Sequence, residues 1–198
     1  MTGTSPGWDS WPPTDPTLAR GFALWREGRL DDAEALFRDW SGTDEEGDAA
    51  RGLGSVLWTR GQFVEARDAF ALALQKAPWN AMHWANLGLA LRDLSKGHSA
   101  LMAFDMALSL APDYEPAWNE KANVLYDFGL YENALPLYQH ALSLNNRRAV
   151  VHHNLGMCLL ALGDSVAALA AFHRALQLEP GYHYSLNMVQ RLTNASPQ

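Results

Sequence analysis

The sequence has very little cysteine and no long uninterrupted apolar run. Cys158 is the single cysteine among 198 residues, which excludes an internal disulfide framework and is typical of a reducing compartment. No apolar stretch approaches the ~20 residues that a membrane-spanning helix requires. The first residues show no charged region followed by an apolar run, so we expect no secretory signal. We therefore expect a cytoplasmic protein without membrane insertion.

Basic residues are scarce at one end of the chain. Residues 1–48 hold eleven acidic side chains against four arginines and so carry the whole formal charge of −7. Because nothing supplies a basic stripe, the sequence argues against nucleic acid as a partner. We interpret the acidic end as a solvated face of the first structural element. Attraction of a basic partner is the alternative.

Motifs that carry enzyme chemistry are also absent. The sequence has no phosphate-binding glycine loop, no nucleophile elbow and no paired carboxylates at telling positions. His152 and His153 are adjacent, so on a helix they point in different directions, and with Met157 and Cys158 they match no metal-ligand spacing. Cys158 is expected to be a buried, unreactive thiol. We expect no enzyme activity, no metal and no cofactor.

What the sequence does contain is an internal repeat. Within 81–114, Gly88 and Ala100 are small where two helices approach closely, and Phe104 fills the space beside them. Apolar residues recur at helical spacing and do not alternate as in strands, which predicts an all-α protein. Stepping by about 34 residues recovers most of the landmarks of this stretch, which are Trp84, Leu87, Gly88, Ala100, Phe104, Ala107 and Pro112.

This pattern resembles the tetratricopeptide-repeat (TPR) family, whose marks are Trp, Leu-Gly, Ala, Phe, Ala and Pro at set places in a repeat of this length. The resemblance covers about 14–182. It implies a right-handed superhelical solenoid of about five helix-turn-helix repeats, with a concave groove that usually binds peptides. It does not identify the ligand.

The period divides the chain into an arm, five repeats and a cap. The Gly/Pro-containing arm is expected to be irregular, and its Trp8 and Trp11 either pack over the first repeat or dock into a groove, in this chain or a neighbour. Our boundaries are 1–13 for the arm, 14–46 for a divergent first repeat, 47–80, 81–114, 115–148 and 149–182 for repeats two to five, and 183–195 for a capping helix.

The capping helix is expected to cover the last repeat with one apolar stripe. Leu186, Val189 and Leu192 form this stripe in our reading of the sequence, whereas Ser185 faces water.

The resemblance implies that the first helix of each repeat lines the groove. Its fifth, ninth and twelfth residues share one face, and the sixth lies beside them. Asparagines there can hold a peptide backbone, aromatic residues can form pockets and arginines can pair with a carboxylate. Equally, these asparagines can be ordinary scaffold residues of the family. The candidate groove residues are Arg51, Trp58, Asn86, Leu89, Arg92, Asn119, Asn123, Tyr126, His153 and Asn154.

Three functions remain open at this point. The first is a non-enzymatic adaptor that binds a segment of a protein partner in the groove. The second is a structural scaffold that self-associates as a homo-oligomer, and the third is a dedicated chaperone of a secretion or assembly partner. A clamp for the C-terminal carboxylate of a chaperone, known in the family, is not supported. Arg51 and Asn86 match its pattern, but Ser55 and Pro116 do not, and Glu120 would repel the carboxylate.

Overall fold

The computed structural model describes residues 15–40 and 44–194, and these residues form eleven α-helices and no strand. The all-α prediction is confirmed. Trp8 and Trp11 lie outside the described residues. The helices are α1 (Pro16–Arg26), α2 (Leu30–Trp40), α3 (Asp48–Thr59), α4 (Phe63–Lys76), α5 (Ala81–Asp93), α6 (Gly97–Leu110), α7 (Glu115–Asp127), α8 (Tyr131–Leu144), α9 (Ala149–Ala161), α10 (Ser165–Leu178) and α11 (His183–Asn194).

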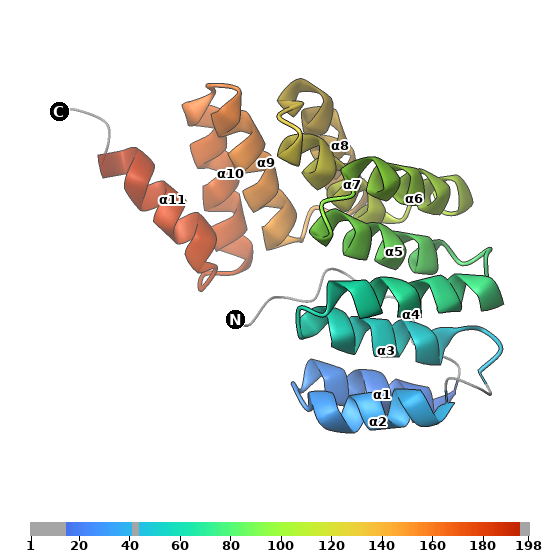
Figure 1. Cartoon of the computed structure of the whole chain (residues 1–198). Coiled ribbons are helices and arrows are strands. Elements are labelled where there is room, and N and C mark those ends of the chain that lie inside the picture. Colours follow the sequence, from blue (N-terminus) through green and yellow to red (C-terminus); the bar gives the residue numbers. More distant parts are fainter. Residues whose placement is uncertain (1–14, 41–43, 195–198) are drawn as a thin grey trace. The chain divides into compact units, whose positions relative to one another are not determined.

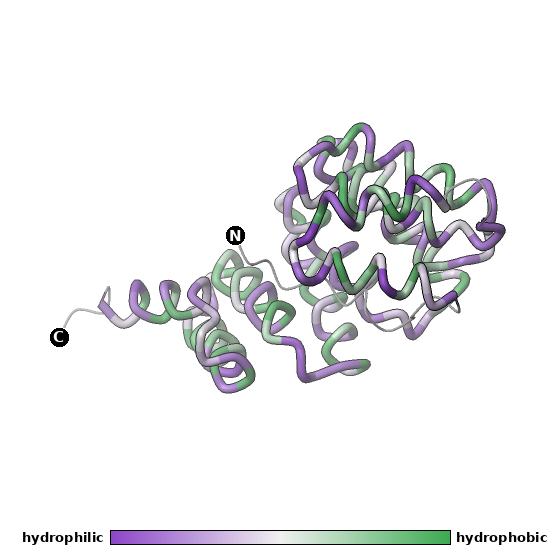
Figure 2. Tube along the Cα trace, turned by 90° about the horizontal axis from the view of Figure 1, so that it is seen from below, coloured by the Kyte–Doolittle hydropathy of each residue, from purple (hydrophilic) through white to green (hydrophobic). Residues whose placement is uncertain are grey.

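The chain forms two compact units, and the boundary between them falls in the first turn of α7. Unit 1 is Met1–Pro116 and unit 2 is Ala117–Gln198. In unit 1 each helix packs on the next in sequence, and the first helices of successive repeats also touch, α1 with α3 and α3 with α5 (Figure 1). In unit 2, α9 packs on α8 and α10, and α11 covers α10. Apolar and polar residues are interspersed along each helix (Figure 2), as expected for helices that bury one face.

Each repeat holds its two helices together with an aromatic ring against a small residue. Phe37, Phe70, Phe104 and Phe172 are fully buried. A Cβ atom added to Gly88 would lie 2.7 Å from the Phe104 ring, so the glycine is what allows this close approach. In the fourth repeat Ala122 and Tyr138 take the two places, and both are buried. The period found in the sequence is therefore the spacing of one packing arrangement.

The helix ends follow local chemistry. Asp15 caps α1 by accepting hydrogen bonds from the backbone N–H groups of Thr17 and Leu18, and Pro16 occupies the first turn. α6 ends at Leu110, two residues before Pro112, which cannot continue a helix.

The turn between the two helices of a repeat needs a residue with left-handed backbone. Gly61, Gly129 and Gly163 supply it with φ of +77°, +75° and +87°. The equivalent residue in the third repeat is Ser95, with φ of +58°. The third repeat therefore keeps the same backbone with a less suitable residue.

The predicted inner face of the capping helix is wrong at two residues, because Leu186 was expected inside and Ser185 outside. In α11, Ser185 is fully buried, and Leu186 is 42% exposed. The reason is a hydrogen bond, because the Ser185 hydroxyl lies 3.0 Å from Nδ1 of His153 on α9. Val189 and Leu192, four and seven residues after Ser185, are partly buried and complete the inner face.

Among the described residues, no helix combines the length and the apolar character needed to span a membrane.

Candidate functional site

Five of the ten candidate groove residues lie on α3 and α5 of unit 1, and they differ in how far their side chains are exposed. Arg51, Asn86 and Leu89 are buried, with 3%, 1% and 4% of their surface exposed. Trp58 and Arg92, at the twelfth position of their repeats, are partly exposed. Counting along the helix identified one face, but only its C-terminal end is open in unit 1.

The Arg51 guanidinium is held by groups of unit 1 itself. Its Nε and Nη2 atoms each lie 2.9 Å from Oδ1 of Asp48, one turn earlier on α3. Its Cζ atom lies 4.2 Å from the centroid of the Phe22 ring on α1, which is a cation–π contact. Arg51 therefore joins α1 to α3.

Two tryptophans connect successive repeats at the open end of this face. The indole Nε1 of Trp25 donates to Oγ1 of Thr59 at 2.8 Å, and that of Trp58 donates to Oδ2 of Asp93 at 2.5 Å. The two bonds are equivalent, because donor and acceptor are separated by 34 and 35 residues. Each bond fixes an indole ring that remains partly exposed.

Asn86 differs from every other candidate asparagine. Within the part of the chain that the structure describes, neither of its amide atoms has a hydrogen-bond partner. The equivalent Asn154 bonds to the fifth and ninth residues of the preceding repeat. In the repeat that precedes Asn86, the fifth and ninth residues are Arg51 and Ser55. The Arg51 side chain has no acceptor, and the Ser55 hydroxyl donates to the Arg51 carbonyl.

Buried beside this face is His83, whose pKa is lowered to about 4. Burial is the main cause, and the positive charge of Arg51 acts in the same direction. The carbonyls of Ala73 and Ala77 and the charge of Asp44 oppose the shift without cancelling it. The ring is therefore neutral at neutral pH.

In unit 2 the corresponding face is a connected polar network. Glu120 accepts from the side-chain amides of Asn119 at 2.9 Å and Asn123 at 3.0 Å. Asn154 of α9 donates to the amide oxygens of Asn119 and Asn123, both at 3.1 Å. The Tyr138 hydroxyl donates to the same oxygen of Asn123 at 2.7 Å. The network ties α7 to α8 and α9, and Asn123 and Asn154 remain partly exposed.

Tyr126 and His153 lie in aromatic surroundings. The Tyr126 ring lies 5.1 Å from that of Tyr131, and burial raises the pKa of its hydroxyl. The centroid of the His153 ring lies 5.4 Å from that of Phe172 and 5.5 Å from that of Tyr182. Burial lowers the pKa of His153 to about 4. Both side chains are partly exposed.

Cys158 and His152 make contacts within the fold. Cys158 is buried, its thiol lies 3.3 Å from the Tyr131 carbonyl and burial raises its pKa. His152 bonds to the Asn146 carbonyl at 3.0 Å, as the equivalent Trp84 does to that of Pro78 at 2.8 Å. No cluster of three or more metal-ligating side chains occurs in residues 15–40 and 44–194.

Sequence reasoning missed one member of the polar network, Glu120, and a pocket near Trp79. Glu120 was considered only as a residue that repels a carboxylate, although its sixth position in the repeat is the one that Asn86 and Asn154 occupy. A pocket near Trp79 was missed as well, because it forms where loop residues meet the start of α5 and the end of α6, away from the positions counted for the groove. A large aromatic residue directly after Pro78 was the available signal for it.

The chain belongs to the tetratricopeptide-repeat family. Family models described as "Tetratricopeptide repeat" match residues 18–81 and 113–180. Proteins with these repeats generally mediate protein–protein interactions.

Known relatives share this repeat over a limited part of their length. The chain is 34% identical over 122 residues to "Protein CTR9 homolog" of Arabidopsis thaliana, which is 60% of this chain and 11% of that protein. It is 32% identical over 104 residues to "Anaphase-promoting complex subunit 7" of Mus musculus, covering 52% of this chain and 18% of the relative. The chain thus spans less than a fifth of the length of these relatives.

Solved structures support the fold. A thermophilic TPR protein of Thermus thermophilus superposes with a TM-score of 0.78 at 20% identity, over 90% of this chain and 97% of that one. The structure reported for pilF of Pseudomonas aeruginosa gives a TM-score of 0.77 at 20% identity, over 90% and 82%.

Proposed function

We propose that this protein is a non-enzymatic interaction module that binds a segment of a partner protein on the first-helix faces of its repeats. It acts as an adaptor or scaffold. Family membership supports the general role. The side chains at the twelfth position of each repeat support the location of the binding site on these faces.

The observation that carries the proposal is the fixed, partly exposed indole of Trp58. Its hydrogen bond to Asp93 holds the ring in one orientation before any partner arrives. A side chain that is already ordered loses little conformational entropy on binding, and tryptophan is enriched among residues that dominate interface energy. Arg92, partly exposed at the same position of the next repeat, adds a charged group that recognises carboxylates.

In unit 2 the amide network supports the same role. At this partly exposed surface the network leaves one N–H of the Asn123 amide and the amide oxygen of Asn154 without a hydrogen bond to a described residue. Such groups bind a peptide backbone without selecting for charge. Tyr126, at the twelfth position, supplies the neighbouring aromatic surface.

The test is an affinity pull-down from native lysate, read by mass spectrometry. Wild type is compared with Trp58→Ala/Arg92→Ala in unit 1 and with Tyr126→Ala in unit 2. Asn123 is left intact, because its loss would strip the buried Tyr138 hydroxyl of its acceptor. The matched control is Val166→Ala, which removes an apolar side chain that is 83% exposed on α10.

A partner retained by wild type and Val166→Ala, and lost by the folded Trp58→Ala/Arg92→Ala variant, supports the proposal. Equal recovery of every partner by all variants contradicts it. Light scattering over a concentration series separates the alternative, because a self-associating scaffold gains mass with concentration and loses it when residues 1–13 are removed.

A further inference from the structure

The outer face of α6 carries an apolar stripe that the groove proposal does not use. Met102, Met106 and Leu110 are 70%, 43% and 43% exposed. They are spaced four residues apart, so they lie on one side of the helix and extend over about 12 Å. We refer to these three residues as the α6 stripe.

The fold does not require this stripe. Residues at the same places in the other second helices include acidic, basic and small side chains. The equivalents are Asp68, Leu72 and Lys76 in α4, Pro136, His140 and Leu144 in α8, and Ala170, Arg174 and Leu178 in α10. Exposed methionine stripes are typical of surfaces that bind apolar partner side chains, because the flexible thioether adapts to different shapes.

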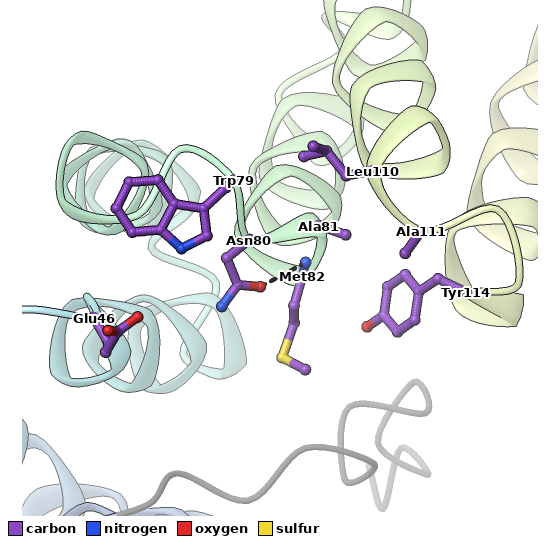
Figure 3. Close-up of a pocket in the computed structure, with 8 residues that line it drawn as sticks. All are labelled: Glu46, Trp79, Asn80, Ala81, Met82, Leu110, Ala111 and Tyr114. Atoms are coloured by element: carbon purple, nitrogen blue, oxygen red, sulfur yellow. Dashed lines mark hydrogen bonds between the residues drawn. The ribbon is translucent and has the colours of Figure 1, made fainter.

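The α6 stripe ends at a pocket. A cavity of about 330 Å³ is formed where α5 begins and α6 ends, and Leu110 belongs to both features. Trp79 is 65% exposed at this pocket. Figure 3 shows Glu46 and Tyr114 on opposite sides, with Asn80 and Met82 between them. We call this the Trp79 pocket, lined by Glu46, Trp79, Asn80, Ala81, Met82, Leu110, Ala111 and Tyr114.

Acidic side chains lie beside both features, and Lys76 at the end of α4 donates to the Asp44 carbonyl. Glu46 lines the pocket, exposed Asp105 lies on α6 between Met102 and Met106, and exposed Asp113 precedes Tyr114. The sequence of α6 contains no lysine or arginine, and Lys96 precedes its first turn at the end remote from the pocket. A ligand that places cations around an apolar anchor is therefore favoured.

We propose that the α6 stripe and the Trp79 pocket together bind a basic amphipathic helix of a partner protein. Leucine or aromatic anchors of that helix, one turn apart, lie along Met102 and Met106, and its last anchor enters the pocket. Its lysines and arginines face Glu46, Asp105 and Asp113. A second copy of this chain is disfavoured because it brings a net charge of −7, and residues 1–14 contain one acid and no base. The surface is separate from the first-helix faces and does not depend on the function proposed for them.

The experiment uses synthetic helices and the full chain. A labelled amphipathic peptide of about 15 residues carries leucines at i, i+4 and i+8 with lysines flanking them, and a matched peptide carries glutamates instead. A third peptide has the sequence of residues 1–14. Binding is measured by fluorescence anisotropy to wild type, Trp79→Ala/Met106→Ser, Glu46→Gln/Asp113→Asn and the control Val166→Ser.

The lysine peptide is expected to bind wild type and Val166→Ser at least about ten-fold more tightly than either other peptide. Trp79→Ala/Met106→Ser should weaken it by at least about ten-fold, as for the loss of an anchor contact. Glu46→Gln/Asp113→Asn should weaken it less and reduce its salt dependence. Since these side chains are exposed, the variants should fold, and circular dichroism checks this.

Three results would overturn the proposal. They are equal binding of the lysine and glutamate peptides, unchanged binding by Trp79→Ala/Met106→Ser, and preferential binding of the peptide of residues 1–14. Because Trp58 and Arg92 stay intact in these variants, failure here leaves the groove proposal standing, and failure of the pull-down leaves this one standing.

Discussion

The two units present equivalent positions of the same repeat with different chemistry. In unit 1 the sixth-position Asn86 is buried beside Arg51 and has no hydrogen-bond partner among the described residues. In unit 2 the equivalent Asn154 joins two asparagines that in turn hold the Glu120 carboxylate. The repeat thus fixes where a side chain lies, but its neighbours in the preceding repeat decide whether its polar atoms are used.

Beneath these different faces the two units share one packing arrangement. Phe104 in unit 1 and Phe172 in unit 2 are fully buried against Gly88 and Gly156. This separation of a constant core from a variable inner face can be tested by substitution, beginning with the core.

The largest effect is expected for truncation of the buried rings. Phe104→Ala and Phe172→Ala should each lower the free energy of unfolding by about 3–5 kcal/mol, because each removes a buried ring and leaves a cavity. The measurement is urea denaturation followed by circular dichroism. If the two losses in free energy of unfolding differ by more than about two-fold, the two buried rings do not contribute equally to stability.

Acid should weaken both units through their buried histidines. His83 in unit 1 and His153 in unit 2 have pKa values of about 4 in the folded protein, against an ordinary value of 6.5. Between these values the unfolded chain binds protons that the folded chain does not, so stability is present above pH 6.5 and is lost as the pH falls toward 4. The loss is on the order of 2–3 kcal/mol for each histidine.

Carboxylates titrate in the same range, so the histidine contribution is measured as a difference. The stability of His83→Gln and of His153→Gln should each depend less steeply on pH than that of wild type, in thermal unfolding followed between pH 7 and pH 4. Parallel curves for wild type and variants would show that these rings accept a proton in the folded state as readily as in the unfolded chain.

The asparagine pair tests the comparison directly. Asn154→Ala removes two hydrogen bonds and should cost about 1–2 kcal/mol. Asn86→Ala should cost less, although Asn86 is more deeply buried, because no bond to a described residue is lost and the desolvated amide is removed. Chemical denaturation of both variants measures the two costs. An equal or larger cost for Asn86→Ala would mean that its amide has a partner in solution.

The helix pairs could be predicted from the sequence because their determinants are local and repeat. Gly88, Phe104 and Pro112 recur at a fixed period, and each acts on its own helix or on the one beside it. The depth of Arg51 could not be predicted, since helical spacing gives a direction and not the amount of covering surface. Ser185 was placed on the wrong side because its polarity is satisfied by His153, which lies 32 residues away.

The smallest expected effect concerns the turn between helices, where the units differ at one residue. Ser95 in unit 1 has φ of +58°, whereas Gly129 in unit 2 has +75° at the equivalent place. A left-handed backbone costs a residue other than glycine about 1–2 kcal/mol. Glycine avoids this cost but loses about 0.5–1 kcal/mol more in backbone entropy on folding.

Ser95→Gly should therefore raise the free energy of unfolding by up to about 1 kcal/mol, and Gly129→Ser should lower it by a similar amount. Paired melting curves of the two variants measure the opposite signs. If Ser95→Gly instead destabilises the protein, the serine side chain must stabilise its turn by more than the strain that its backbone carries.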